Sequence, residues 1–328
     1  MGKWLGIADE TVFGTPVTPP TVFIDCASID LHPERVPASV VTTNLIGPST
    51  TAIGQYNIRG EVEVIPNSFN IAKLLKFLLG TPTSVNDGGG RWKHTYLPSD
   101  TLKWGTMYKV DDQWPDGTNA LQYISTICTS MRLEAALNAF VSTRFGLLGL
   151  KDAKVAKPTV GTFNATDQFF SLDGKMYWDI TGTLEETNIA AVSLTYTREI
   201  PDDFLSMNEA FLRGFIPGNA SVEGSVDLIF ANWLAYEKFW GGSSGPAISP
   251  LPAAMMFDFT GAVLGGTGDY DYHRLKIKLP AVTLPSINEP VEGRDKIIQT
   301  VNFQANRGTV EAVSAICSMI LTNTATAT

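Results

Sequence analysis

Gly60-Glu61-Val62-Glu63-Val64-Ile65 alternates acidic and β-branched side chains, which is the period of a strand with one buried face. After a short break, Asn67 to Leu79 changes to a helical period, with its apolar side chains roughly on one face. Asn67 or Ser68 can cap this helix, and Gly80 follows its end. The stretch predicts a strand followed by a short amphipathic helix.

The same order occurs a second time. Gly224-Ser225-Val226-Asp227-Leu228-Ile229 precedes a short helical pattern near Asn232 to Trp240, which ends at Gly241-Gly242. Three further pairs of segments match in the same order: Ser28–Leu31 with Ser193–Tyr196, Met131–Leu133 with His273–Leu275, and Phe140–Phe145 with Ile298–Phe303. We interpret these matches as an internal duplication, with domains at residues 1–155 and 156–328. A single large β-domain with similar strands is the alternative.

Most other segments also have the composition and alternation of strands. They are punctuated by 29 glycines and 19 prolines. The predicted fold class is mainly β, with two tandem β-sandwich or half-barrel domains, each flanked by a short α-helix.

Composition limits the classes of function. The 328 residues are 44% hydrophobic and 17% charged, which favours a folded core and a surface partly covered by partners. A formal net charge of −9 argues against a protein that binds nucleic-acid phosphates. Three widely separated cysteines, with no predicted signal peptide or spanning segment, lead us to expect a product made in the cytoplasm of a cell.

No group of residues predicts catalysis or metal binding. The three histidines are isolated, and Asp269-Tyr270-Asp271 lacks the further carboxylates of a calcium loop. Nucleophile, phosphate-loop and dinucleotide motifs are absent from the sequence. We therefore expect no enzyme activity and no cofactor.

The amino-terminal stretch Leu5-Gly6-Ile7-Ala8-Asp9-Glu10-Thr11-Val12-Phe13-Gly14-Thr15-Pro16 resembles the start of many tail tube proteins of siphophages, the long-tailed phages with non-contractile tails. The unit of strands and a helix ending in Leu79-Gly80-Thr81 is also similar to that family. The second half lacks the Phe-Gly-Thr-Pro motif. The resemblance implies β-sandwich domains that assemble into rings, whose inner strands form a continuous barrel, and rings that stack into a hollow tube. With two domains in one chain, it implies a homotrimeric ring with pseudo-sixfold symmetry.

A tube that conducts DNA should repel phosphates from its inner wall. Acidic and polar residues that alternate with apolar ones on the proposed inner strands are the candidates. We predict that the pore is lined by Asp30, Glu61, Glu63, Thr195 and Asp227. The alternative is that these residues lie on a solvated face or between subunits.

Two long segments are predicted to contact the adjacent ring. Residues 36–56 and 200–219 are each about 20 residues long, and loops of that length are usually functional. The candidate contact residues are Leu45, Ile46, Thr51, Ile53, Phe204, Leu205, Phe211 and Phe215. An ordinary surface loop is the alternative for both segments.

The resemblance also implies partners and a location. These are other copies of the chain, the tape measure protein and phage DNA in the lumen, and the tail terminator and tail tip proteins, all in the virion. The alternatives are another β-rich virion protein (a capsid decoration or baseplate ring protein) and a carbohydrate-binding β-sandwich. The strand His273 to Leu279 presents basic residues on one face, which fits either a DNA-binding stripe or, as we expect, pairing with acidic residues of the neighbouring subunit or domain copy.

Overall fold

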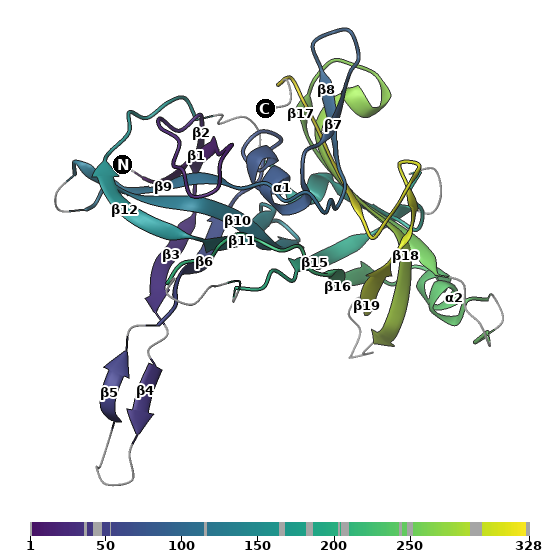
Figure 1. Cartoon of the computed structure of the whole chain (residues 1–328). Coiled ribbons are helices and arrows are strands. Elements are labelled where there is room, and N and C mark those ends of the chain that lie inside the picture. The colour runs from purple at the N-terminus through teal and green to yellow at the C-terminus, as the bar shows by residue number, and fades with distance from the viewer. Residues whose placement is uncertain are drawn as a thin grey trace.

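The computed structural model describes residues 2–35, 38–41, 48–52, 54–114, 117–163, 168–181, 186–202, 204, 210–242, 245–247, 252–288 and 297–325. The described part is mainly β-structure in antiparallel sheets, with two short α-helices (Figure 1). This confirms the predicted fold class. The helices are α1 (Ala72–Leu79) and α2 (Leu234–Trp240), which lie within the predicted stretches. The prediction that Asn67 or Ser68 caps α1 was wrong, because the helix begins at Ala72 with Ile71 as N-cap, after a turn.

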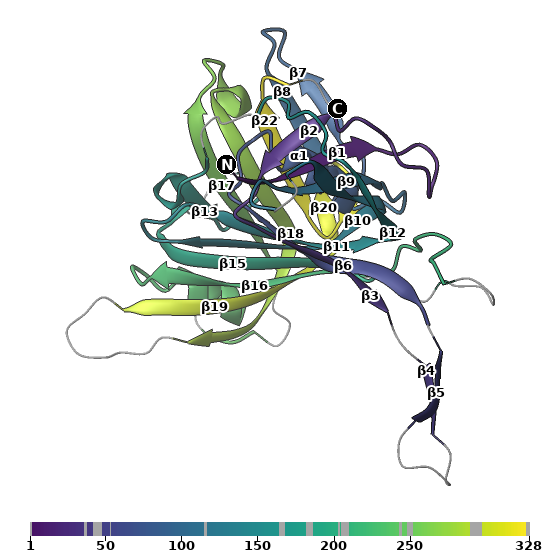
Figure 2. The same ribbon diagram turned by 90° about the vertical axis from the view of Figure 1, so that its left-hand side faces the viewer.

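One sheet of eight antiparallel strands runs through the whole chain (Figure 2), and we call it the long sheet. Its strands, in spatial order, are β3 (Ser28–Arg35), β6 (Tyr56–Val64), β11 (Ser142–Gly149), β10 (Asn119–Ala136), β15 (Ile189–Arg198), β16 (Ala220–Ile229), β19 (Ile298–Asn306) and β18 (Tyr272–Asn288). The first four strands come from the first half of the chain, and the last four come from the second half.

Two shorter sheets cover one face of the long sheet. The first consists of β2 (Val22–Asp25), β1 (Lys3–Asp9), β9 (Gly105–Asp111), the first part of β10, and β12 (Lys151–Ala156). The second consists of β14 (Glu186–Thr187), β13 (Gly174–Tyr177), β17 (Ala253–Val263), the first part of β18, β22 (Ser318–Asn323), β8 (Trp92–Tyr96) and β7 (Thr83–Asn86). The remaining elements are β4 (Ala38–Val41) with β5 (Pro48–Ala52), β20 (Gly308–Val310) with β21 (Val313–Ala315), and two 3-10 turns, η1 (Ser171–Asp173) and η2 (Gly268–Tyr270).

The core lies between the long sheet and the covering sheets. Val62, Phe145, Met131, Leu194 and Val226 are each at most 1% exposed, and they share one face of the long sheet. Their sequence neighbours on each strand are polar, apart from Gly146, and point the other way, because side chains alternate along a strand. The resulting core is one continuous cluster that includes residues from both halves.

The strands β10 and β18 each serve two sheets, and they bend at matching places. The pairing of β10 with β11 shifts between Cys128 and Ser130, and that of β18 with β19 shifts between Thr283 and Ser286. Such bulges bend a strand and increase its twist. Each strand enters the long sheet just before this point, because β10 pairs with β11 from Ile127 and β18 pairs with β19 from Ala281.

Two glycines allow close approach of neighbouring strands at equivalent places. Gly60 of β6 lies opposite Leu31, and Gly224 of β16 lies opposite Leu194. A Cβ on Gly60 would lie 1.7 Å from the carbonyl oxygen of Asp30, and a Cβ on Gly224 would lie 2.2 Å from that of Ser193. Gly60 also has a φ of 148°, which disfavours any other residue.

These registers show how the two halves correspond. Counting from the paired glycines and from the bulges, Leu31 corresponds to Leu194 and Met131 corresponds to Ile287. The sequence comparison that matched Met131 with His273 was wrong, because both strands are long and His273 lies near the start of β18, in the covering sheet. The match of the two strand–helix stretches agrees with the registers, whereas the matches of Ser28–Leu31 with Ser193–Tyr196 and of Phe140–Phe145 with Ile298–Phe303 are each displaced by two residues.

The two halves also differ. A hairpin of β7 and β8 follows α1 and pairs with β22, so it extends the covering sheet of the second half. A second hairpin, formed by β4 and β5, follows β3 and extends away from both sandwiches (Figures 1 and 2). We call this second hairpin the arm. In the part of the chain that the structure describes, no helix is long and apolar enough to cross a membrane.

Candidate assembly surfaces

The uncovered face of the long sheet is polar along its whole length. One row crosses seven strands, and its members are directly paired side chains: Ser28, Glu63, Arg144, Arg132, Thr195, Glu223 and Gln304. We call this surface the polar face. All five predicted pore residues, Asp30, Glu61, Glu63, Thr195 and Asp227, occur on it, because each is at even spacing from a member of this row on its own strand. That the polar face lines a pore remains a prediction.

The polar face also carries arginines that the pore prediction left out. The Arg132 guanidinium lies 2.5 Å from the Glu134 carboxylate, and that of Arg144 lies 3.5 Å from Glu63. The Arg59 guanidinium pairs with Asp202 and lies 3.8 Å from Glu34. Because each of these cations has an acidic partner, the face offers phosphate little unpaired positive charge. The alternation Arg59, Glu61, Glu63 in the sequence already contained part of this pattern.

The acidic side chains still outnumber the arginines on the polar face. The carboxylates are Asp30, Glu34, Glu61, Glu63, Glu134, Glu223 and Asp227, and the guanidinium groups are Arg59, Arg132 and Arg144. Seven negative charges against three positive ones leave a balance of −4 on the described residues of this face. The surface would therefore repel a polyanion that passes along it.

The long sheet ends in two open edges. Among the described residues, β3 is paired only with β6, and residues 283–288 of β18 are paired only with β19. Among the described residues, β3 and β18 are not paired with each other, and no second series of paired strands connects them. The long sheet is therefore open. Unpaired edges present a row of N–H and C=O groups that can pair with another strand.

The chain contains an internal example of how such edges join. In the middle of the long sheet, β10 of the first half pairs with β15 of the second half, from Ser130 opposite Thr197 to Ala136 opposite Ala191. The strands that correspond to β10 and β15 are β18 and β3, which carry the two open edges. A second copy of the chain could therefore repeat the β10–β15 junction.

The arm carries one of the two predicted ring contacts. Residues 36–54, which contain it, have no charged side chain. The predicted residue Thr51 lies in β5, while Leu45, Ile46 and Ile53 lie outside the described residues. A projecting hairpin without charge is suited to burial against another protein surface.

Some of the described residues of the segment 200–219 pack against their own chain. The Phe215 ring lies 5.4 Å from Phe13 in a small apolar cluster that also includes the buried Leu212. The Tyr56 amide at the foot of the arm donates a hydrogen bond to the Ala210 carbonyl at 2.8 Å. Contacts within the chain therefore account for part of the burial that was expected from a neighbouring ring.

Two aromatic residues of the same segment remain available. Phe204 is 42% exposed, and Phe211 is 43% exposed although its ring lies 5.5 Å from that of Tyr56. Leu205 lies outside the described residues. The predicted contact with an adjacent ring stays a prediction for these positions.

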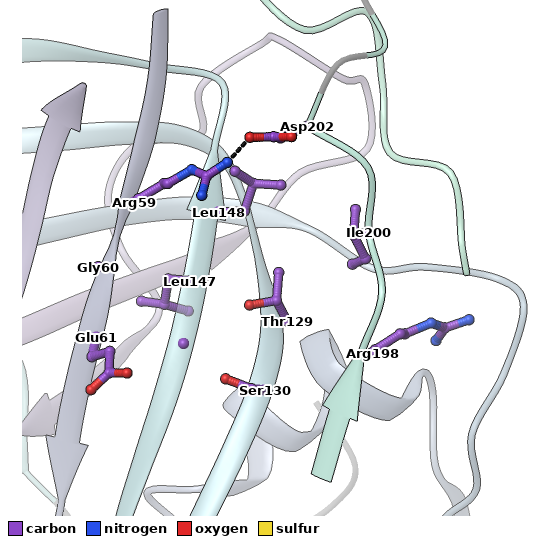
Figure 3. A pocket seen from close by; sticks show the side chains of 11 residues that line it. Arg59, Gly60, Glu61, Thr129, Ser130, Leu147, Leu148, Arg198, Ile200 and Asp202 are labelled. Carbon is purple, nitrogen blue, oxygen red and sulfur yellow. Dashed lines mark ion pairs between the residues drawn. The ribbon is translucent and has the colours of Figure 1, made fainter. Parts of the chain in front are cut away.

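A pocket of about 390 Å³ lies between β6, β11, β10 and the residues that end and follow β15 (Figure 3). Thr129 and Ser130 line it, and the Arg59–Asp202 ion pair crosses one side. None of the described residues that line it is a histidine, cysteine or lysine, the side chains that most often activate a hydroxyl nucleophile. In the described part of the chain, no three His, Cys, Asp or Glu side chains are grouped to hold a metal ion.

The basic strand His273 to Leu279 is the start of β18, and acidic residues of the same half neutralise it. The Lys276 ammonium lies 2.6 Å from the Asp269 carboxylate, and that of Lys278 lies 2.6 Å from Glu311. The guanidinium of Arg274 lies 3.2 Å from Asp271. These ion pairs favour pairing with acids over binding to DNA, but the partners belong to the same half of the chain and not to a neighbouring subunit or domain copy as expected.

A chain with an open β-sheet, a polar face and a projecting uncharged arm has the features of a structural protein that assembles with copies of itself. The family model for phage tail tube protein matches residues 5–305. The chain therefore belongs to the phage tail tube protein family, and it is a structural component of the virion. No curated protein matches it.

Proposed function

We propose that this protein forms the hollow tube of a siphophage-type tail as stacked rings, each a homotrimer of chains with two tube domains. The two domains are residues 1–155 and 156–328. Their strands share one order and one pattern of register shifts, which supports a duplication. In this arrangement three chains contribute six similar units, which gives the pseudo-sixfold symmetry.

The observation that carries the ring is the β10–β15 junction inside the chain. If β18 of one copy meets β3 of the next in the same way, the long sheets of all copies join edge to edge. The registers then predict Ser286 opposite Glu34 and Asn288 opposite His32 of the neighbouring copy. Closing the sheet removes the open edges that would otherwise template aggregation.

In the ring the polar face forms the pore, and DNA passes along it toward the host. The excess of carboxylates and the pairing of each arginine support this orientation, because a phosphate backbone would find few cations to bind. The tape measure protein would occupy the same lumen before ejection. The tail terminator and tail tip proteins would bind the two ends of the tube. The role is structural, with no reaction catalysed by this chain.

The arm joins one ring to the next in this proposal. Replacing residues 38–52 by a short Gly-Ser turn should leave the fold and the rings intact, because the arm pairs only with itself among the described residues. Negative-stain microscopy should then show single rings instead of tubes. Tubes of normal length from this variant would contradict the role of the arm, and a wild-type protein that forms neither rings nor tubes would contradict the proposed function.

A further inference from the structure

Four aromatic residues form a row along α2 and the turn that precedes it. The Phe230 and Trp233 ring centroids are 5.5 Å apart, Trp233 and Tyr236 are 5.4 Å apart, and Tyr236 and Trp240 are 5.3 Å apart. Trp233 is 55% exposed, and Ala235 is the single buried residue of the helix. We call Phe230, Trp233, Tyr236 and Trp240 the aromatic row.

The corresponding helix of the first half is covered. Six of the eight residues of α1 are buried. The turn that leads into α1 is held by residues of the second half: the Ser68 hydroxyl and the His273 ring nitrogen are 2.7 Å apart, and the Asn323 side-chain amide donates to the Ser68 carbonyl at 2.6 Å. His273 lies near the start of β18, and Asn323 is the end of β22.

The first half has counterparts of the start of β18 and the end of β22, but these counterparts lie far from α2. By strand register, the start of β18 corresponds to the start of β10, and the end of β22 corresponds to the end of β12. These two places are joined by a hydrogen bond from the Lys157 amide to the Thr118 carbonyl at 2.8 Å. Within one chain, β12 and α2 lie at opposite ends of the molecule (Figure 1).

We propose that the aromatic row is a docking surface for a second copy of this chain, and that the occupant is the end of its first sandwich around Thr118, Lys157 and Val160. Val160 is 41% exposed, and Trp114 is half-buried nearby in sequence to Thr118, so this end offers apolar surface. The contact reproduces between copies the cover that the second half gives to α1 inside the chain. This docking contact rests on the proposed ring. It adds a second contact between copies, separate from the pairing of the sheet edges.

The first test is the substitution Trp233→Glu. Buried aromatic residues often dominate an interface, so we expect the protein concentration at half-assembly to rise about tenfold or more. Val263→Glu is the matched control, because Val263 is 71% exposed and lies outside the docking surface; we expect it to stay within about twofold of wild type. Sedimentation velocity measures the assembly, and circular dichroism with a thermal melt verifies that both variants fold.

The second test is a cross-link in the assembled protein. The pair Trp233→Cys and Val160→Cys should form a disulfide between copies, whereas Trp233→Cys with Val263→Cys should not. The native cysteines Cys26, Cys128 and Cys317 are buried and should not compete. If rings form but Trp233→Glu assembles as wild type and the first pair stays uncross-linked, the docking surface is wrong while the proposed ring stands. A wild-type protein that forms no rings would overturn both.

Discussion

The two halves of this tube protein have the same strand order but different surroundings. In the first half, the second half covers the turn before α1 and pairs with β10, so Val192 at that junction is only 3% exposed. In the second half, no described residue of the chain gives such cover to Trp233 beside α2 or to the edge formed by residues 283–288 of β18. The difference supports the proposal that the contact between copies repeats the internal junction.

The largest expected effect compares Val192 with the corresponding residue Ile29 of β3. Val192→Lys places a charge in a closed junction, and we expect it to destabilise the fold by about 3 kcal/mol or more. Ile29 lies on the open edge, where a lysine can reach solvent, so Ile29→Lys should remain folded as a monomer. In the ring it would be buried like Val192, and assembly should need about a hundredfold more protein.

Urea unfolding and sedimentation velocity on the two variants separate these outcomes. The comparison fails if Ile29→Lys assembles like wild type, or if Val192→Lys is as stable as wild type.

The second prediction concerns the two glycines of the long sheet. Gly60→Ala and Gly224→Ala each force a methyl group against a neighbouring carbonyl, so we expect each to destabilise the fold by about 3 kcal/mol. Gly60→Ala should cost somewhat more, because Gly60 also has a positive φ. Denaturant unfolding measures both. A loss of stability at one glycine and none at the other would contradict the proposed correspondence between the two halves.

The third prediction uses an ion pair of α1. The Asp9 carboxylate lies 2.8 Å from the Lys73 ammonium and 2.7 Å from that of Lys76, and Lys73 is only 4% exposed. Burial raises the pKa of Asp9, but the two lysines outweigh it and hold that pKa below its usual value. Burial lowers the pKa of Lys73 despite Asp9, which offsets part of the gain. Allowing for the partial exposure of Asp9, we expect Asp9→Asn to destabilise the fold by about 2 kcal/mol.

The pH dependence checks the same pair. A carboxyl group with a lowered folded pKa stabilises the fold above its unfolded pKa of about 3.8, and this contribution is lost as the pH falls through the folded pKa. The stability difference between wild type and Asp9→Asn should therefore shrink below about pH 4. A constant difference from pH 6 to pH 3 would contradict the assignment.

The smallest effect on stability is expected on the polar face. Glu61→Gln leaves an exposed carboxamide and should change the free energy of unfolding by less than about 0.5 kcal/mol. If the polar face lines the pore, neutralising Glu61 in every copy should slow DNA release from phage without altering the tube. Unchanged release kinetics with Glu61, Glu63 and Asp227 all neutralised would argue against that orientation.

The sequence was sufficient for the parts of the fold that depend on local periodicity. Alternation gave the strand at Glu61 to Val64 and the face on which Asp227 lies, and the helical period gave α1 and α2. The registers were not accessible in this way, because Met131 and His273 both sit in strands of similar composition. Only the bulges in β10 and β18 show which parts of those strands correspond.

The same limit applied to the surfaces. The sequence indicated that residues 200–219 contain a buried apolar contact, but it did not show that Phe215 packs on Phe13 of the same chain. It grouped the acidic residues of the polar face and missed Arg132 and Arg144, because ion pairs across strands depend on register. The sequence placed most of the aromatic row in a helix. It did not show that Trp233 is exposed, because exposure depends on which elements pack against that helix.

The most direct test of the account is a pair of cross-strand disulfides. Ser130→Cys with Thr197→Cys spans the internal junction, where the two residues are paired, and should close within one chain. Ser286→Cys with Glu34→Cys occupies the corresponding positions of β18 and β3. In assembled protein under mild oxidation, the second pair should give covalent trimers in non-reducing gels. If the first pair forms its disulfide efficiently and the protein with the second pair stays monomeric, the proposal that the ring repeats the internal junction is contradicted.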